Sequence, residues 1–181
     1  LRKSTKMAHP FLLQLLEQTL LDPGEPLFQA QFFQLAGQKD NQFLNSKSFF
    51  SEAGLVLSDD LKNTFLEKPE DFTFFLYAKN GDLRWGFVVR VSSIATAGQK
   101  MAEQEASLAQ IFSPLIKPLG QKEGETNLSF QSARYRQVAF RYASLSEKNL
   151  GLCWATTRDY LILTSSGESL MQVINRLLSN Q

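Results

Sequence analysis

Residues 160–178 read YLILTSSGESLMQVINRLL, and this stretch decides the fold class of the chain. Its first five residues have the length and composition of a β-strand. Ser165 and Glu168 have the S-x-x-E spacing of a capping box, which predicts that a helix begins directly after Ser165. The apolar residues of that helix recur at the spacing of one face. They are Leu170, Val173, Ile174, Leu177 and Leu178.

The stretch 72–91 predicts a β-hairpin. Residues 72–78 (FTFFLYA) are rich in residues that prefer strands, and Asn80-Gly81 is the commonest two-residue hairpin signal. Alternation in the returning strand places its large apolar residues on one face, with Arg84 and Arg90 on the other. These apolar residues are Trp85, Phe87, Val89 and Val91.

The remaining elements complete an α+β pattern. Thr96 and Gln99 predict a second capping box, opening a helix that runs to about Ser113. Four strands then follow, over residues 127–130, 133–143, 150–156 and 160–164, before the closing helix. We therefore expect an antiparallel sheet of about six strands, in the order β-β-α-β-β-β-β-α, with two helices on one face.

The first third of the chain is less regular. Residues 1–58 are expected to form an N-terminal helix, centred on Phe11–Leu21, and an irregular extension; residues 27–35 alternate only partly and leave a strand open. Ser58 predicts the cap of a short helix, and residues 59–181 form the sheet domain. At 181 residues we expect one structural domain overall.

Composition excludes several classes of function. The net charge of +1 offers no general attraction for nucleic acid or for an anionic membrane. The single cysteine, Cys153, and the single histidine, His9, exclude an internal disulfide, a multi-cysteine zinc site and a histidine-based triad within one chain. No apolar stretch is long enough to cross a bilayer. We predict no cofactor and no metal.

The carboxylates offer two candidate sites, each with a structural alternative. Glu105 falls within the apolar stripe of the second predicted helix, where burial could raise its pKa for catalysis, but a position at the rim of that face is favoured. Asp59 and Asp60 suggest a cation site, yet the loop pattern of a calcium site is absent and acidic residues favour a helix start.

The possible nucleophiles also favour structural roles. Ser165, Ser166 and Ser169 lie at a strand-to-helix turn, but the G-x-S-x-G elbow of the hydrolases is missing. Cys153 beside Trp154 is typical of a small buried hydrophobe. We therefore predict no catalytic residue and no enzyme.

Residues 134–142 (RYRQVAFRY) interleave cations with aromatics, as nucleic-acid-binding strands do. As one strand, they would turn Val138 and Phe140 to the core and leave Tyr135 and Arg141 outside. Nucleic acid is therefore not the expected ligand. Instead a partner surface is predicted at Arg134, Tyr135 and Arg141, and an apolar pocket is predicted at Phe32, Phe43 and Phe49.

Residues 60–181 resemble a group of uncharacterised bacterial proteins from small-genome uncultivated lineages. The resemblance is carried by FTFFLYAKNGDLRWGFVVRV, the helix over residues 101–115, and RYRQVAFRY with LCWATTRDYLILTSSGESLMQVINRLL. These proteins look like single-pass membrane proteins with an extracytoplasmic domain of unknown function. The resemblance implies a place in the cell envelope, with membrane contact only through an anchor upstream of Leu1, and it brings no catalytic residues.

These observations favour a non-enzymatic extracytoplasmic module that serves in interaction or assembly. Its partner would be another protein or a second copy of the chain. Two alternatives stay open, a small apolar ligand-binding protein and a subunit of a pilus or secretion platform. A deep apolar pocket favours the binder, whereas a shallow surface with a paired two-fold contact favours the assembly module.

Overall fold

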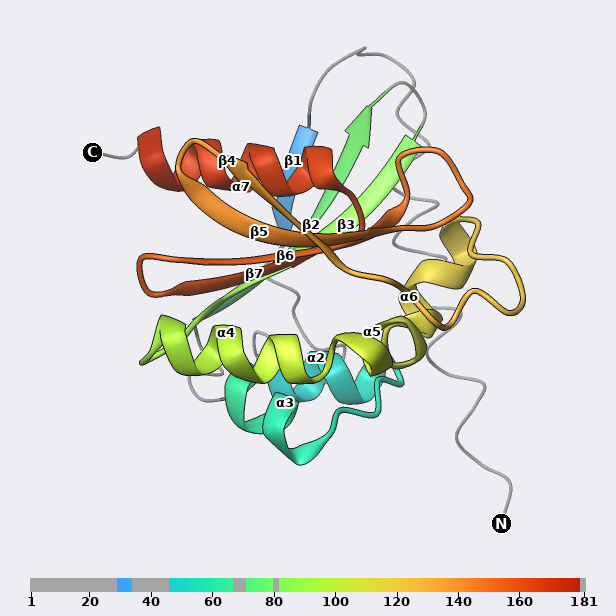
Figure 1. The fold of residues 1–181 in the computed structure, drawn as a ribbon, viewed down its shortest axis with the longest axis horizontal. Coiled ribbons are helices and arrows are strands. Elements are labelled where there is room, and N and C mark those ends of the chain that lie inside the picture. Colours follow the sequence, from blue (N-terminus) through green and yellow to red (C-terminus); the bar gives the residue numbers. More distant parts are fainter. Residues whose placement is uncertain (1–28, 34–45, 67–70, 80–81, 180–181) are drawn as a thin grey trace.

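The computed structural model describes residues 29–33, 46–66, 71–79 and 82–179, which form an α+β fold around one antiparallel sheet (Figure 1). The α+β class and the predicted order of elements from residue 72 onward are confirmed. Within the described residues the sheet has seven strands, in the spatial order β1-β2-β3-β7-β6-β5-β4. They are β1 (Gln29–Phe33), β2 (Phe72–Lys79), β3 (Asp82–Arg90), β7 (Tyr160–Thr164), β6 (Gly151–Thr157), β5 (Val138–Ser144) and β4 (Gln131–Tyr135).

Helices cover both faces of this sheet, so the prediction of two helices on one face is wrong (Figure 1). One face carries α2 (Ser46–Glu52), α3 (Asp59–Phe65), α4 (Ile94–Glu103), α5 (Glu105–Ile111), α6 (Ser113–Ile116) and the 3-10 turn η1 (Lys117–Leu119). The other carries α7 (Gly167–Ser179). The physical reason lies in the central strands, where successive residues such as Leu161, Ile162 and Leu163 are all buried and each face therefore needs a cover.

The core between the sheet and α2 to α6 is aromatic. Trp85 and Phe87 of β3 lie in this core as predicted, with their rings stacked at 5.6 Å between centroids. Phe49 and Phe50 of α2 lie in the same core, and Phe50 contacts Phe87 edge-on at 5.5 Å. The described residues 46–58 therefore share the core of the sheet domain.

The core beneath α7 is smaller. Phe75 of β2, Ile162 of β7 and Cys153 of β6 supply its floor. The predicted apolar face of α7 is confirmed, because Leu170, Val173 and Ile174 are buried and Leu177 and Leu178 pack against them.

The second helix starts earlier and is more broken than predicted. Its cap is Ser93, whose hydroxyl accepts a hydrogen bond from the Thr96 amide at 3.3 Å, so the capping box predicted at Thr96 and Gln99 is wrong. The chain then leaves the helical path at Gln104 and at Phe112, which separates α4, α5 and α6. Ser58 caps α3 as predicted.

Residues 133–143 form a hairpin and not the single strand that was predicted. β4 and β5 are joined by Arg136 and Gln137, whose φ angles of 46° and 67° are those of a two-residue turn. The turn has no glycine, so the usual signal was missing from the sequence. Residues 127–130, predicted as a strand, precede β4 and belong to no strand. β2 and β3 pair Lys79 with Asp82, as the predicted hairpin requires.

Candidate functional site

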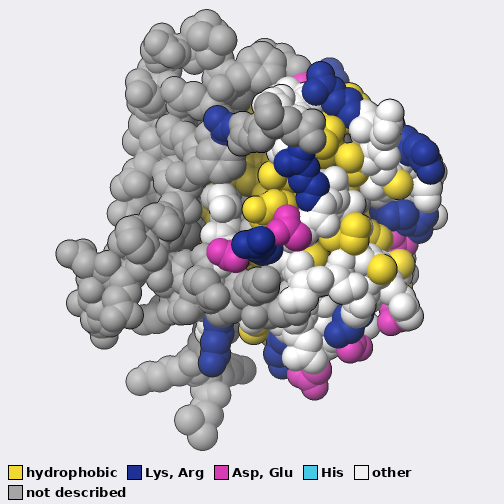
Figure 2. Space-filling model, turned by 90° about the vertical axis from the view of Figure 1, so that its left-hand side faces the viewer, with side chains coloured by type: hydrophobic (Ala, Val, Ile, Leu, Met, Phe, Trp, Pro, Cys, Tyr) yellow, Lys and Arg dark blue, Asp and Glu magenta, His cyan; other side chains and the backbone are white. Residues whose placement is uncertain are grey.

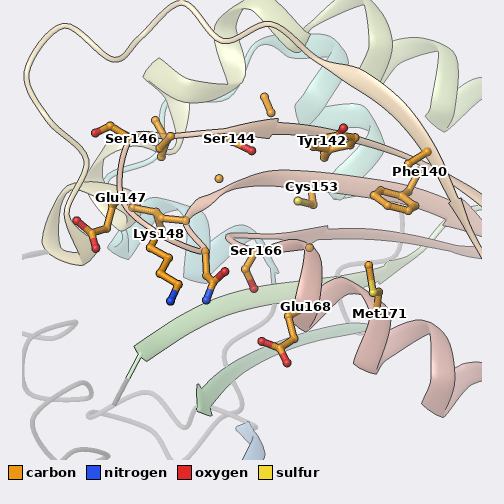
Figure 3. Close-up of a pocket in the computed structure, with 17 residues that line it drawn as sticks. Phe140, Tyr142, Ser144, Ser146, Glu147, Lys148, Cys153, Ser166, Glu168 and Met171 are labelled. Atoms are coloured by element: carbon orange, nitrogen blue, oxygen red, sulfur yellow. The ribbon is translucent and has the colours of Figure 1, made fainter. Parts of the chain in front are cut away.

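An open hollow of about 690 Å³ lies on the α7 face of the sheet (Figure 3). Three parts of the chain enclose it: the strands β4 to β6 form its floor, the loop of residues 145–150 closes one end, and the first turns of α7 form a wall. The hollow is a candidate binding site, because its size falls in the range of small-ligand pockets and its floor is apolar.

The floor consists of apolar side chains that the β4–β5 hairpin turns toward α7. Phe140 and Tyr142 of β5 lie two residues apart and point to this face, with 5.9 Å between their ring centroids. Cys153 of β6 pairs with Tyr142 and lies between the strands and α7 (Figure 3). Ala133 of β4 and Met171 of α7 complete the apolar lining.

Cys153 is buried, as predicted for a small core residue. Burial raises the pKa of its thiol to about 12, so the thiol stays protonated near neutral pH. A protonated thiol is a poor nucleophile. The side chain therefore serves the hollow as part of its apolar floor.

A buried arginine holds the loop that closes the hollow. Arg84 of β3 is 5% exposed, and its guanidinium donates hydrogen bonds of 2.8 Å to the carbonyl oxygens of Lys148 and Asn149. A third bond of 2.7 Å goes to its neighbour Leu83, and the Asp82 carboxylate lies 3.7 Å away. Three backbone acceptors and one carboxylate satisfy a cation that would otherwise be costly to bury. Arg84 therefore fixes the position of this loop.

The start of α7 differs from the prediction by one residue. The Ser166 hydroxyl accepts a hydrogen bond from the Ser169 amide at 3.1 Å, so Ser166 is the cap and the predicted capping box of Ser165 and Glu168 is wrong. Ser165 instead continues the sheet, because its amide donates a bond of 2.8 Å to the Trp85 carbonyl oxygen, and its hydroxyl accepts a bond of 2.8 Å from the Trp85 amide. All three serines of this turn have structural hydrogen bonds, in agreement with the structural role expected for them.

Glu168 projects from the first turn of α7 at the edge of the hollow (Figure 3). Burial raises the pKa of Tyr77 on β2 to about 12, and the charge of Glu168 and a hydrogen bond to it act in the same direction. The carboxylate of Glu168 thus has a partner on the sheet, and it adds a negative charge next to the helix start.

The predicted partner surface of Arg134, Tyr135 and Arg141 is divided between the two faces of the sheet, so the prediction of one common surface is wrong. The Tyr135 hydroxyl donates a hydrogen bond of 3.0 Å to Asn175 on α7. Arg141 lies on the opposite face, where it pairs with Glu105 of α5. The two-residue turn is the cause, because it aligns Tyr135 with Val138 and reverses the parity expected for a single strand.

Glu105 lies at the edge of the helix face, as the structural alternative proposed. Its carboxylate accepts two hydrogen bonds from Arg141, at 2.8 and 2.6 Å, and one of 3.0 Å from the Trp154 indole. These bonds join α5 to the strands β5 and β6, and the Glu105 hydrogen bond also raises the pKa of the Arg141 guanidinium. The arrangement is a structural clamp, which sequence reasoning missed because its partners are distant in the chain.

Of the three residues of the predicted apolar pocket, the structure describes the side chain of Phe49 alone. Phe49 is 2% exposed and packs against Phe74, with 4.7 Å between ring centroids. Phe43 lies outside the described residues, as does the side chain of Phe32.

Asp59 forms an ion pair of 3.0 Å with Lys62 at the start of α3. In the described residues no group of three or more histidine, cysteine, aspartate or glutamate side chains could hold a metal.

Strand β4 ends the sheet next to the hollow, and its outer edge is the second feature of the site. The two-residue turn makes Tyr135 and Val138 a hydrogen-bonded pair, so Ala133 also bonds to β5. The intervening Ser132 and Arg134 therefore direct their backbone N–H and C=O groups away from β5. Among the described residues, no strand pairs with this edge. Nothing in the sequence marked the edge, because strand order is a tertiary property.

No family model matches this chain, and no curated protein matches its sequence. Among the helices that the structure describes, none is both long enough and apolar enough to cross a membrane. On the face shown in Figure 2, basic and acidic side chains are interspersed among hydrophobic ones over the described residues. The geometry of the hollow and of the adjoining edge is therefore the basis for a functional proposal.

Proposed function

We propose that this chain is a non-enzymatic interaction module that binds an extended segment of a protein partner along β4. The observation that carries the proposal is the outward edge of β4, which offers the backbone groups of Ser132 and Arg134 directly beside the hollow. Such an edge can take up an additional strand, whose backbone bonds supply affinity and whose side chains supply specificity.

The hollow would receive one side chain of the added strand. Ala133 is the residue of β4 that lines the hollow, and its small side chain leaves the floor of Phe140 and Tyr142 open toward the edge. Alternate side chains of an added strand would point to this same face. In peptides selected from a random library, where this position is free to vary, we expect a large apolar side chain there, packed against Met171.

The use of the polar groups supports a non-enzymatic role. Within the described residues, the buried serines of the α7 turn and the Glu105 carboxylate are engaged in structural hydrogen bonds. Burial holds the Cys153 thiol in its protonated form.

A selection of random heptapeptides on immobilised protein tests the proposal. We expect selected peptides to slow hydrogen exchange at the Ser132 and Arg134 amides. Arg134→Pro removes one outward donor without breaking a bond to β5, and should weaken peptide binding at least tenfold. Arg134→Ala keeps the donor and is the matched control, which should bind within about twofold of the unmodified chain.

A small apolar ligand is the second candidate, because about 690 Å³ is within the range of ligand pockets. The hydrophobic dye 1-anilinonaphthalene-8-sulfonate distinguishes the two candidates. If dye binding is lost in Met171→Glu, and if no selected peptide responds to Arg134→Pro, the hollow acts as a small-ligand pocket and strand addition is wrong. Val56→Glu is the control for added charge, since Val56 is 83% exposed and lies away from the hollow, between α2 and α3.

A place outside the cytoplasmic membrane is part of the proposal. It is supported by the resemblance of residues 60–181 to extracytoplasmic domains. Protease added to spheroplasts that produce the full-length protein tests it. Cleavage before lysis supports the location, and protection until lysis contradicts it.

A further inference from the structure

We propose that the strand taken up by β4 comes from a second copy of this chain, which pairs its own β4 antiparallel about a two-fold axis at Ala133. The inference rests on the proposed function, because it uses the same edge and names the partner. It makes one continuous sheet from the two seven-stranded sheets.

The backbone of β4 is complementary to itself in this register. A two-fold axis at Ala133 places Arg134 of one copy opposite Ser132 of the other, and the converse pair follows by symmetry. Ser132 and Arg134 are the two residues of β4 whose backbone groups point outward. Both pairs would therefore be hydrogen-bonded pairs, with each outward donor facing an outward acceptor. Shifting the strands by one residue loses this match.

The side chains also agree with this register. Ala133 would face Ala133 of the second copy, and a small side chain allows close approach at the axis. Tyr135 would lie opposite Gln131 of the second copy on the α7 face, beside the open side of the hollow. Gln131 already accepts a hydrogen bond of 2.8 Å from the Tyr142 hydroxyl, which orients its amide at that edge. No bulge or proline interrupts β4, and these are two common obstacles to edge pairing.

Charge favours the same register over its neighbours. Arg134 is exposed, and an axis at Arg134 itself would place two arginines directly opposite each other, which is unfavourable. With the axis at Ala133, each Arg134 instead faces Ser132 of the other copy. Arg141 donates a hydrogen bond of 2.7 Å to that serine and is itself paired with Glu105, so its charge is neutralised where Arg134 of the other copy approaches. The whole chain, at a net charge of +1, adds little repulsion between copies.

Disulfide trapping tests the register directly. Opposed residues that do not exchange backbone bonds have Cα atoms about 4.5 Å apart, within the range of a disulfide. Ala133→Cys should therefore form a covalent dimer under mild oxidation. Gln131→Cys should not, because the two copies of residue 131 lie about four residues apart along the paired strands. The unmodified chain should give no covalent dimer, since Cys153 is buried.

Light scattering across a concentration series gives the second readout. We expect a dimer that dissociates on dilution, and at least a tenfold weaker dimer for Arg134→Pro, with Arg134→Ala close to the unmodified chain. A monomer at all concentrations with no trapping at residue 133 overturns the second copy as partner. If heptapeptides still bind β4 in that case, the proposed function stands. If Arg134→Pro weakens neither peptide binding nor dimer formation, both the proposed function and the second copy as partner are wrong.

Discussion

Adding one methyl group at Gly86 should destabilise the protein, whereas adding one at Gly98 should stabilise it. Gly86 lies in β3 between Phe75 of β2 and Thr164 of β7. A Cβ atom at Gly86 would lie 2.6 Å from Cε1 of Phe75 and 2.7 Å from Cγ2 of Thr164. Both neighbours are buried, so neither can turn away into solvent. Contacts this short require the core beneath α7 to shift.

The size of the effect follows from the distances. To bring Cε1 to an ordinary contact near 3.4 Å, the Phe75 ring must move by about 0.8 Å within a packed core, and Cζ, which lies closer still, requires a larger movement. We expect this strain to cost about 2–3 kcal/mol. The alanine also lowers the conformational entropy of the unfolded chain, and this stabilising effect offsets about 0.5–1 kcal/mol of the strain. A net loss of about 2 kcal/mol lowers the melting temperature by about 4–8 °C in a chain of this length.

Gly98→Ala is the matched control. Gly98 lies inside α4, and its added Cβ would be 3.5 Å from Oγ1 of Thr156, which is an ordinary contact. Because alanine favours the helix, we expect a gain of about 0.5–1 kcal/mol. Equilibrium unfolding in urea, followed by tryptophan fluorescence, measures both variants.

A third variant separates strain at Phe75 from other causes. Phe75→Leu replaces the ring that blocks the site by a smaller side chain. In the Gly86→Ala background, this substitution should therefore lower the free energy of unfolding by at least about 1 kcal/mol less than it does in the unmodified chain. If the free energy of unfolding of Gly86→Ala lies within about 0.5 kcal/mol of that of the unmodified chain, the packing argument for the core beneath α7 is wrong. The same holds if the two alanine substitutions have effects of one sign.

Three further predictions test the site and its supports. Burial raises the pKa of Cys153 from 9.0 to about 12 and that of Tyr77 from 10.0 to about 12, so the folded protein holds these protons more tightly than the unfolded chain does. Their contribution to stability is complete below about pH 9 and is lost as the pH rises toward 12; urea unfolding against pH should show this decline, and Cys153→Ala should reduce it. Gln137→Gly relieves the positive φ of the β4–β5 turn and should stabilise the protein by about 0.5–1 kcal/mol in thermal unfolding, and a loss of stability would contradict the hairpin. Glu105→Gln removes the charge that holds Arg141 and should cost about 1–2 kcal/mol in urea unfolding, with a smaller cost at high salt; an unchanged stability would show that the clamp contributes nothing.

Much of the second half of the fold could be predicted from local pattern. The strand at residues 160–164 and the buried face of α7 were predicted correctly, because both depend on side-chain periodicity that neighbouring residues determine. The capping residues were predicted with less success. Ser166 and Ser93 are the caps, whereas the motif spacing pointed to Ser165, one residue earlier, and to Thr96, three residues later. Spacing alone cannot choose between such neighbours, because the strand that precedes each helix decides where it begins.

The candidate site was the part least accessible to prediction. Its floor depends on the turn at Arg136 and Gln137, and without a glycine this turn could not be distinguished from a continuing strand. One unrecognised turn reversed the direction of Tyr135 and merged two strands into one. The hollow also depends on Arg84, whose acceptors at Lys148 and Asn149 are more than sixty residues away in the chain. Contacts of that range leave no local periodic signal.

The amino-acid sequence by itself determined the α+β class, the hairpin of β2 and β3, the strand β7 and the apolar face of α7, since these follow from local periodicity and composition. Only the tertiary structure decided on which side of the sheet each helix lies, which strand ends the sheet, and how the hollow forms beside it. The physical reason is that hydrophobic patterning records whether a side chain is buried and does not record what buries it. In β6 and β7 both faces are apolar, so helices must pack on both faces of the sheet. The path of the chain then assigned α4 to one face and α7 to the other, leaving the edge of β4 open beside the hollow within the part of the chain that the structure describes.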